Sequence, residues 1–397
     1  MAIDYFADQP SPSEIHDRMK GYASWFEIDL DSLGHNLKEI RDRVGVEVMP
    51  VVKNNAYGHG LLPVVAYLSR ESMEWFMVAK LKEAVAIRDA GIPGHVVSMD
   101  AMFSEGQFRE VVDKGITQVV YTREVADTLN EVAGRMGKEA ETFVKVDTGL
   151  RRVGVPHSEA ADLIEHVHNL PNVSVRGIFS TFMQNPDQDP VMLQRLLSVD
   201  EELRERGVQV ELRSMASSDA IFHNPTAWLD MVRPGMSLYG VYPEKKDAAS
   251  GLELRQVLTF KARIEHTKWV EEGDSVTYWG RFVAPRRMRI GTLHIGFYDG
   301  VPREMANVGR IKVDGVYKSS LGSVSLNHYL MDLADVDASV GDVVEVIGRE
   351  DENSLFSTAE TAGWMVYSLM NHLNPFTPRV YMEKGEPVAL LDLRAMQ

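Results

Sequence analysis

From about Glu47 onward, short apolar runs rich in β-branched residues alternate with amphipathic stretches, and this alternation repeats eight times over roughly 200 residues. Buried parallel strands have this apolar character, and each needs a helical crossover before the next strand. Eight such units predict a (β/α)8 TIM barrel, and an open doubly wound sheet is the alternative. The predicted strands span 47–52, 75–78, 95–98, 118–121, 142–146, 175–180, 209–212 and 228–232.

The pattern changes after about Leu254, where polar and apolar residues alternate in runs separated by glycine or aspartate turns. This alternation, seen at 258–265, 288–295, 310–313 and 342–347, predicts a mainly antiparallel β domain. A chain of 397 residues is long enough for two domains. We therefore expect an α/β fold with an N-terminal extension at 1–22, a barrel at 23–250 and a C-terminal β domain at 251–397, with the linker near 244–251.

Charge and cysteine content exclude several classes of function. The formal net charge is −16, and basic residues cluster only in short pairs such as Arg151–Arg152. Such pairs cannot neutralise a run of phosphates, so neither a nucleic acid nor an anionic membrane is an expected partner. The chain has no cysteine, which excludes disulfides and thiolate metal sites, and no metal site is predicted. The first residues do not have the pattern of a signal peptide, so we expect a cytoplasmic protein.

The first predicted barrel strand ends in the string PVVKNNAYGHG at residues 50–60. Lys53 follows the strand directly, and the carboxyl end of a barrel strand lies at the catalytic face. The low dielectric there can lower a lysine pKa enough for the amine to form a Schiff base. Lys53 is therefore a candidate nucleophile, with a solvated lysine at a strand end as the structural alternative.

Together with WFEIDLDSLGHNL at residues 25–37, this string closely resembles the opening of the alanine racemase family. The resemblance implies pyridoxal 5'-phosphate (PLP) as the cofactor, bound covalently by Lys53, with Tyr57 in contact with its phosphate. It also implies the barrel of the fold-type III PLP enzymes and an amino-acid substrate.

A later string, FVKVDTGLRRVG at residues 143–154, resembles the family's fifth-strand motif. Lys145 corresponds to a lysine that is often carbamylated in the family. Arg152 corresponds to an arginine that reaches the phenolic oxygen of the cofactor and the substrate. A salt bridge of both residues with Asp147 is the structural alternative.

The string MVRPGMSLYG at residues 231–240 resembles the eighth-strand motif, in which Arg233 would face the pyridine nitrogen. Arginine does not release its proton, so this nitrogen should stay unprotonated and the ring should be a weaker electron sink. The same comparison places Ser218 and the amides of Gly235 and Met236 around the phosphate. Barrel phosphate sites form after strands seven and eight for geometric reasons that do not depend on the resemblance.

The second half of the chain resembles the family's second domain at 276–282, 296–303, 322–328 and 378–381. The resemblance implies a head-to-tail homodimer in which this domain completes the partner's active site. Phe297, however, stands where the family has a catalytic tyrosine, and a phenyl ring cannot exchange a proton. Tyr298 can replace that tyrosine only if the loop is rearranged, because neighbouring side chains on an extended backbone point to opposite faces.

Other polar groups of the family's site are also replaced. Leu326 and Asn327 stand at the Met-Asp pair of the substrate-binding region. Thr181 and Ser214 stand where histidines support the cofactor ring and its arginine, and Pro375 stands where a phosphate-binding tyrosine is expected.

Three hypotheses follow. The first is a PLP-dependent amino-acid racemase or epimerase, in which Lys53 serves one face of the substrate, Arg152 orients it, and Tyr298 or another group serves the opposite face. The second, motivated by Phe297, is a one-base PLP lyase or aldolase-like enzyme. The third, suggested by the number of replaced residues, is a catalytically silent PLP-binding protein. The side chain of the substrate does not follow from the sequence.

Overall fold

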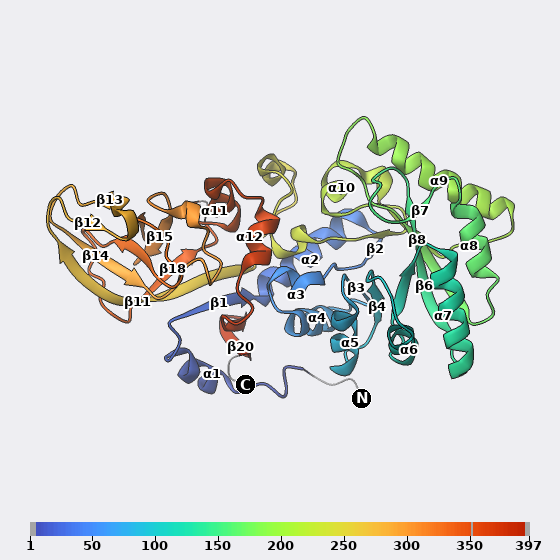
Figure 1. The fold of residues 1–397 in the computed structure, drawn as a ribbon, viewed down its shortest axis with the longest axis horizontal. Helices are drawn as coiled ribbons and strands as arrows, with labels where there is room; N and C mark the ends of the chain where they lie inside the picture. Colours follow the sequence, from blue (N-terminus) through green and yellow to red (C-terminus); the bar gives the residue numbers. More distant parts are fainter. Residues whose placement is uncertain (1–4, 351, 394–397) are drawn as a thin grey trace.

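The computed structural model describes residues 5–350 and 352–393. Figure 1 shows a barrel of strands and surrounding helices beside an extended β domain, with the helix α12 between them. No helix in the described part of the chain is long and apolar enough to cross a lipid bilayer.

Eight parallel strands form the barrel. Six of them pair in the order β3-β4-β5-β6-β8-β9, and β10 pairs with β2. Isolated parallel bridges between Val51 and Met77 and between Ser217 and Arg233 join these two groups and close the barrel. The predicted TIM barrel is therefore confirmed, and the open doubly wound sheet is ruled out. The strands are β2 (Glu47–Val48), β3 (Trp75–Val78), β4 (His95–Ser98), β5 (Thr117–Val120), β6 (Ala140–Asp147), β8 (Val173–Phe179), β9 (Leu212–Ser214) and β10 (Met231–Val232), with β7 (Val155–Pro156) beside β6.

The seventh strand begins later than the predicted 209–212. The amide of Val208 donates to the carbonyl of Leu203, so the preceding residues close the end of α9 instead of starting a strand. Gly207 has a φ of 80°, as expected for a residue that ends a helix in the left-handed region.

Amphipathic helices cover the barrel and bury one face each. In α7 (Arg123–Met136), for example, the Thr122 side chain caps the first turn, Leu129 and Val132 are buried, and Gly137 ends the helix with a φ of 64°. The other barrel helices are α2 (Leu30–Val44), α4 (Leu61–Arg70), α5 (Leu81–Asp89), α6 (Glu105–Asp113), α8 (Ala160–His168), α9 (Asp189–Glu205) and α10 (Ser218–His223). The short element α3 (Lys53–Tyr57) has left-handed backbone angles and is a turn at the barrel mouth.

A nine-stranded sheet dominates the second domain, in the order β14-β17-β16-β15-β18-β11-β1-β19-β20. All of its described pairings are antiparallel except that of β1 with β19. The mainly antiparallel character predicted for this region is therefore confirmed. The elements are β11 (Leu258–Val270), β12 (Ser275–Val276), β13 (Phe282–Val283), β14 (Met288–Leu293), β15 (Arg310–Val313), β16 (Val316–Leu321), β17 (Tyr329–Asp332), β18 (Val343–Ile347), α11 (Leu355–Ala362), α12 (Val366–His372), β19 (Arg379–Glu383) and β20 (Glu386–Leu391).

The strand β1 (Ser24–Asp29) precedes the barrel in sequence but lies in this second sheet, between β11 and β19. In Figure 1 it is the blue strand beside the yellow β11. The predicted barrel range of 23–250 thus includes one strand of the other domain. The helix α1 (Pro12–Met19) packs on the same sheet, where its Ile15 is buried against Trp25 and Val380.

Candidate active site

Lys53 begins α3 at the carboxyl end of the first barrel strand, and the backbone after it forms an unusual turn. Asn54, Asn55, Ala56 and Tyr57 all have φ between 52° and 57°, in the left-handed region. Such a conformation costs about 1–2 kcal/mol for each residue with a side chain, so other contacts must maintain it. The turn places Tyr57 beside the barrel mouth, and the Nζ atom of Lys53 lies 5.9 Å from the centre of its ring.

Glu83 of α5 is one residue that maintains this turn, and sequence reasoning missed it. Its buried carboxylate accepts hydrogen bonds from the amides of Asn55 at 2.9 Å and of Lys80 at 3.2 Å. The Asn55 side chain in turn accepts from the amide of Leu61 at 2.9 Å. Lys80 cannot act as a side-chain N-cap, so no local sequence signature marks Glu83 as a residue that supports both the helix start and a distant loop.

The second domain fixes the same loop from the other side. Arg379 of β19 is fully buried, and its Nε donates to the carbonyl of Gly58 at 2.7 Å. The hydroxyl of Tyr381 donates to the carbonyl of His59 at 2.9 Å. A Cβ atom at Gly60 would lie 1.8 Å from that hydroxyl, so glycine is required there. The two domains therefore share the support of the segment that carries Lys53.

Positive groups gather at the barrel mouth: Lys145 and Arg233 are buried, Lys53 is half-buried, and Arg152 is exposed. Burial lowers the pKa of Lys53, and Arg152 and Arg233 lower it further while Glu83 opposes them. Burial and the same two arginines lower the pKa of Lys145 to about 7. The Lys145 amine donates to the Thr181 hydroxyl at 3.3 Å. Lys145 can therefore exist as a neutral amine near neutral pH, and the lowered pKa of Lys53 shifts its amine in the same direction.

Asp147 does not form the salt bridge that was the structural alternative for this region. One of its oxygens accepts from the amides of Gly149 at 2.9 Å and Arg151 at 3.0 Å. Within residues 5–350 and 352–393, no ion pair joins it to Lys145 or to the exposed Arg152. The guanidinium of Arg152 is thus available at the surface of the mouth.

Arg233 is buried and held by barrel groups, including two of the residues that depart from the family. Its guanidinium donates to the carbonyl of Ser180 at 2.6 Å and to the hydroxyls of Ser214 and Thr181. The Ser214 hydroxyl in turn donates a hydrogen bond to the carbonyl of Met231 at 2.6 Å. Burial lowers the pKa of Arg233 to about 10, so it stays charged at neutral pH. Two hydroxyls thus bind the arginine. Ser214 stands where the resemblance implied a histidine that supports this arginine, and Thr181 stands where it implied a histidine that backs the cofactor ring.

Hydroxyl and amide donors converge after strands β9 and β10. The Ser218 hydroxyl oxygen accepts from the amides of Gly235 at 2.9 Å and Ser237 at 3.3 Å. A Cβ atom at Gly235 would lie 2.8 Å from the Tyr57 hydroxyl oxygen, so only glycine permits this approach. The structure therefore brings the predicted Tyr57, Ser218, Gly235 and buried Met236 together, and adds the amide of Ser237.

A cavity of about 750 Å³ opens beside these donors, and Met236, Asp219 and Tyr367 contribute to its lining. Tyr367 of α12 is a second residue that sequence reasoning missed. Its ring centre lies 5.9 Å from that of Tyr57, and burial raises its pKa to about 12. The expected position, Pro375, instead offers its carbonyl to Arg379 at 3.1 Å. The helix α12, which the sequence pattern did not predict, carries the tyrosine to the cavity.

The residues predicted on the second domain form a separate, exposed group. Phe297 is 42% exposed, Tyr298 54% and Leu326 50%, and Asn327 is half-buried. The amides of Phe297 and Tyr298 donate to the carbonyls of Ser325 and Leu326 at 3.0 and 3.1 Å. The loop is a turn, in which the amide of Asp299 donates to the carbonyl of Gly296, so the extended backbone assumed from the sequence is wrong. Strict alternation of side chains therefore does not apply to Phe297 and Tyr298.

Comparisons with known proteins identify relatives over almost the whole chain. The families described as "Alanine racemase, N-terminal domain" and "Alanine racemase, C-terminal domain" match residues 28–243 and 257–381. "Alanine racemase 2" of Caldanaerobacter subterraneus subsp. tengcongensis is 34% identical, covering 91% of this chain and 95% of the relative. An alanine racemase of Clostridium perfringens is 31% identical, covering 93% and 97%. The structure of an alanine racemase of Clostridium difficile matches with a TM-score of 0.89 at 28% identity, covering 94% and 99%.

Proposed function

Because this chain belongs to the alanine racemase family, we propose that it is a PLP-dependent amino-acid racemase or epimerase acting at the substrate Cα. The observation that carries this proposal is the convergence, at one barrel mouth, of desolvated lysines, a buried arginine and a cradle of hydroxyl and amide donors. The curated relatives are named alanine racemases, so alanine is the first substrate to test.

The donor set fits PLP. The hydroxyls of Tyr57, Ser218 and Tyr367 and the amide of Gly235 would hold the phosphate. Burial raises the pKa of both tyrosines, so they stay protonated and can donate. Lys53 would hold the cofactor covalently, and Arg233 would face its pyridine nitrogen. When bound, PLP supplies an electron sink that stabilises negative charge at the substrate Cα.

Lys53 would move the proton on one face of the substrate. Its lowered pKa increases the neutral fraction, which is the form that accepts a proton from Cα. Arg152 would orient the substrate carboxylate, since a guanidinium can donate two parallel hydrogen bonds to it. The neutral amine of Lys145 is the form that reacts with carbon dioxide, and a carbamate there would place a negative charge beside Arg152.

Racemisation also needs a group on the opposite face of the substrate. We assign this role to Tyr298 of the other subunit in a head-to-tail homodimer, with Leu326 and Asn327 beside it in the substrate-binding region. The exposure of Phe297, Tyr298 and Leu326 supports this arrangement, because large apolar side chains exposed together are typical of an interface.

Phe297 also favours a second candidate, a one-base lyase or aldolase-like enzyme on the same scaffold. If Tyr298 does not reach the substrate, Lys53 alone can act, and it serves only one face. Cleavage of a bond to Cα on that face then remains available. The new product would be a keto acid, an aldehyde or an amine.

Deuterium labelling separates these candidates. The purified chain is incubated with PLP and single enantiomers of alanine and other amino acids in D2O, and α-deuterium and chirality are followed together. Racemisation gives label with inversion in both directions, and Lys53→Ala is the control that should give neither. Label with full retention, or a new product, would favour the one-base enzyme. Absence of any labelling or product across the panel would overturn both and leave a silent PLP-binding protein.

A further inference from the structure

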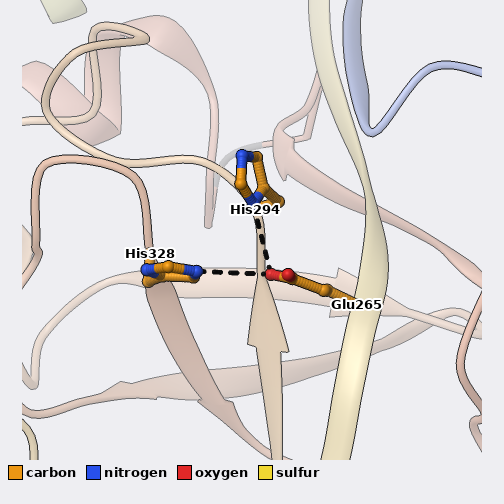
Figure 2. Close-up of side chains that lie close together, drawn as sticks. All are labelled: Glu265, His294 and His328. Atoms are coloured by element: carbon orange, nitrogen blue, oxygen red, sulfur yellow. Dashed lines mark hydrogen bonds and ion pairs between the residues drawn. The ribbon is translucent and has the colours of Figure 1, made fainter.

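Three side chains from neighbouring strands meet on the surface of the second domain. Glu265 lies in β11, His294 directly follows the last residue of β14, and His328 directly precedes the first residue of β17. Both β11 and β17 pair with β14, so residues far apart in sequence reach the same place. Figure 2 shows the imidazoles approaching the carboxylate of Glu265 from two directions.

A backbone irregularity directs Glu265 toward the histidines. In the pairing of β11 with β14, Ile264 faces Leu293 and His266 faces Thr292, so Glu265 is the extra residue of a β-bulge. Bulges re-aim side chains and are common beside functional sites. The bulge consequently brings the carboxylate of Glu265 beside His294.

The distances match those between ligands of a tetrahedral metal. The same Glu265 oxygen lies 3.3 Å from His294 Nδ1 and 3.4 Å from His328 Nε2. One ligand atom from each residue lies within 4.8 Å of the other two. Ligands about 2.0–2.1 Å from Zn²⁺ in a tetrahedron are separated by roughly 3.4 Å. Two edges already have this length, and rotation of an exposed imidazole can close the third.

The ligand types select among metals. Two imidazole nitrogens and one carboxylate oxygen suit Zn²⁺ and other late first-row ions, whereas Mg²⁺ and Ca²⁺ prefer all-oxygen sites. The three side chains are between 44% and 51% exposed, so an ion can enter from solvent and water can fill the fourth position.

We propose that Glu265, His294 and His328 form a binding site for a divalent transition metal, with Zn²⁺ as the best match. This site goes beyond the proposed function, because metal binding here requires neither PLP nor turnover. A bound ion would cross-link β11 to the two loops that carry Phe297–Tyr298 and Leu326–Asn327. Those loops already share hydrogen bonds, from the amide of Phe297 to the carbonyl of Ser325 at 3.0 Å and from the amide of Tyr298 to the carbonyl of Leu326 at 3.1 Å.

The first test is calorimetric titration of ZnCl2 into the PLP-loaded full chain, purified without a polyhistidine tag and treated with EDTA. We expect one Zn²⁺ per chain, and we expect His294→Gln and His328→Gln each to weaken the affinity by more than about tenfold. His266→Gln is the matched control, because His266 is an exposed histidine next to Glu265 but outside the cluster. It should retain the wild-type affinity.

Two results would overturn the site: no Zn²⁺ binding by the wild-type chain, or equal loss of affinity in the control and the cluster variants. Since all three side chains are exposed, the variants should unfold at the wild-type temperature in EDTA. Amide hydrogen exchange then tests the cross-link. Zn²⁺ should slow exchange at Phe297 and Tyr298 in the wild type but not in His328→Gln, and unchanged exchange in the wild type would disprove the coupling between the metal and the loops.

Discussion

The barrel mouth and the exposed loops of the second domain differ in how completely one chain supports them. Arg233 and Lys145 are each only 5% exposed, whereas Tyr298 is 54% exposed. Arg233 and Lys145 have hydrogen-bond partners within the barrel of the same chain, while Tyr298 and Leu326 present their side chains to solvent. One chain therefore organises the cofactor side of the site by itself. The contrast fits the proposed homodimer, in which the exposed loops of one chain would cover the barrel mouth of the other.

The largest effect is expected when the amine of Lys53 is removed from the barrel mouth. Lys53→Ala should lower racemisation by about a thousandfold or more, because one side chain supplies both covalent attachment and proton transfer. Loss of the PLP absorbance shift on binding measures the attachment, and turnover measures the catalysis. Lys80→Ala removes an exposed lysine nearby and should retain activity. Racemisation of equal rate in Lys53→Ala would disprove the assignment of the mouth as the reacting centre.

The exposed loop is tested by exchanging the roles of two neighbouring rings. Tyr298→Phe should lower racemisation by roughly a hundredfold, while deuterium still enters with retention on the Lys53 face. Phe297→Tyr places a hydroxyl at the neighbouring position and shows whether that side chain reaches the substrate. Recovery of inversion in the double variant F297Y/Y298F would assign the second face to position 297. Unchanged inversion in Tyr298→Phe would show that another group serves as the second base.

The contact between the two domains at Arg379 and Gly58 can be tested through the stability of the chain. Arg379→Met should lower the free energy of unfolding by about 3 kcal/mol, because the carbonyl of Gly58 and carbonyls near Asn374 lose a buried donor. It should also weaken PLP binding, since Gly58 follows the turn that carries Tyr57. Denaturant unfolding and PLP titration measure the two effects. Arg70→Met, at a half-exposed ion pair with Glu383, is the control and should cost less than about 1 kcal/mol.

Much of the mouth could be predicted from sequence because its residues lie in continuous strings at strand ends. The string around Lys53 and the one around Arg233 fix both residue type and position along a strand. Barrel topology then brings the carboxyl ends of these strands together at one face. Glu83 and Tyr367 could not be found this way, because each reaches the site from a separate helix. The loop at Phe297 was misjudged for a related reason, since its turn depends on hydrogen bonds to Ser325 and Leu326, distant in sequence.

The same limit explains why the Glu265, His294 and His328 cluster was not predicted. No two of these residues share a strand or a local motif, and their meeting depends on strand order and on one bulge. Strand order in a sheet of this kind is set by long-range packing. Sequence reasoning was therefore strongest where function is local and weakest where several elements converge.

The smallest expected effect is a pH dependence of the free energy of unfolding, caused by the burial of Lys145 at the barrel mouth. Because the pKa of Lys145 falls from its usual 10.5 to about 7, the unfolded chain binds more protons than the folded chain between these values. Stability contributed by this residue should therefore rise with pH, by about 2 kcal/mol between pH 7 and 9. Guanidinium unfolding in carbonate-free buffer should show this rise in the wild type relative to Lys145→Met. The exposed Lys82 provides the control, and an equal pH trend in Lys82→Met and Lys145→Met would show that burial at the mouth does not set the charge of Lys145.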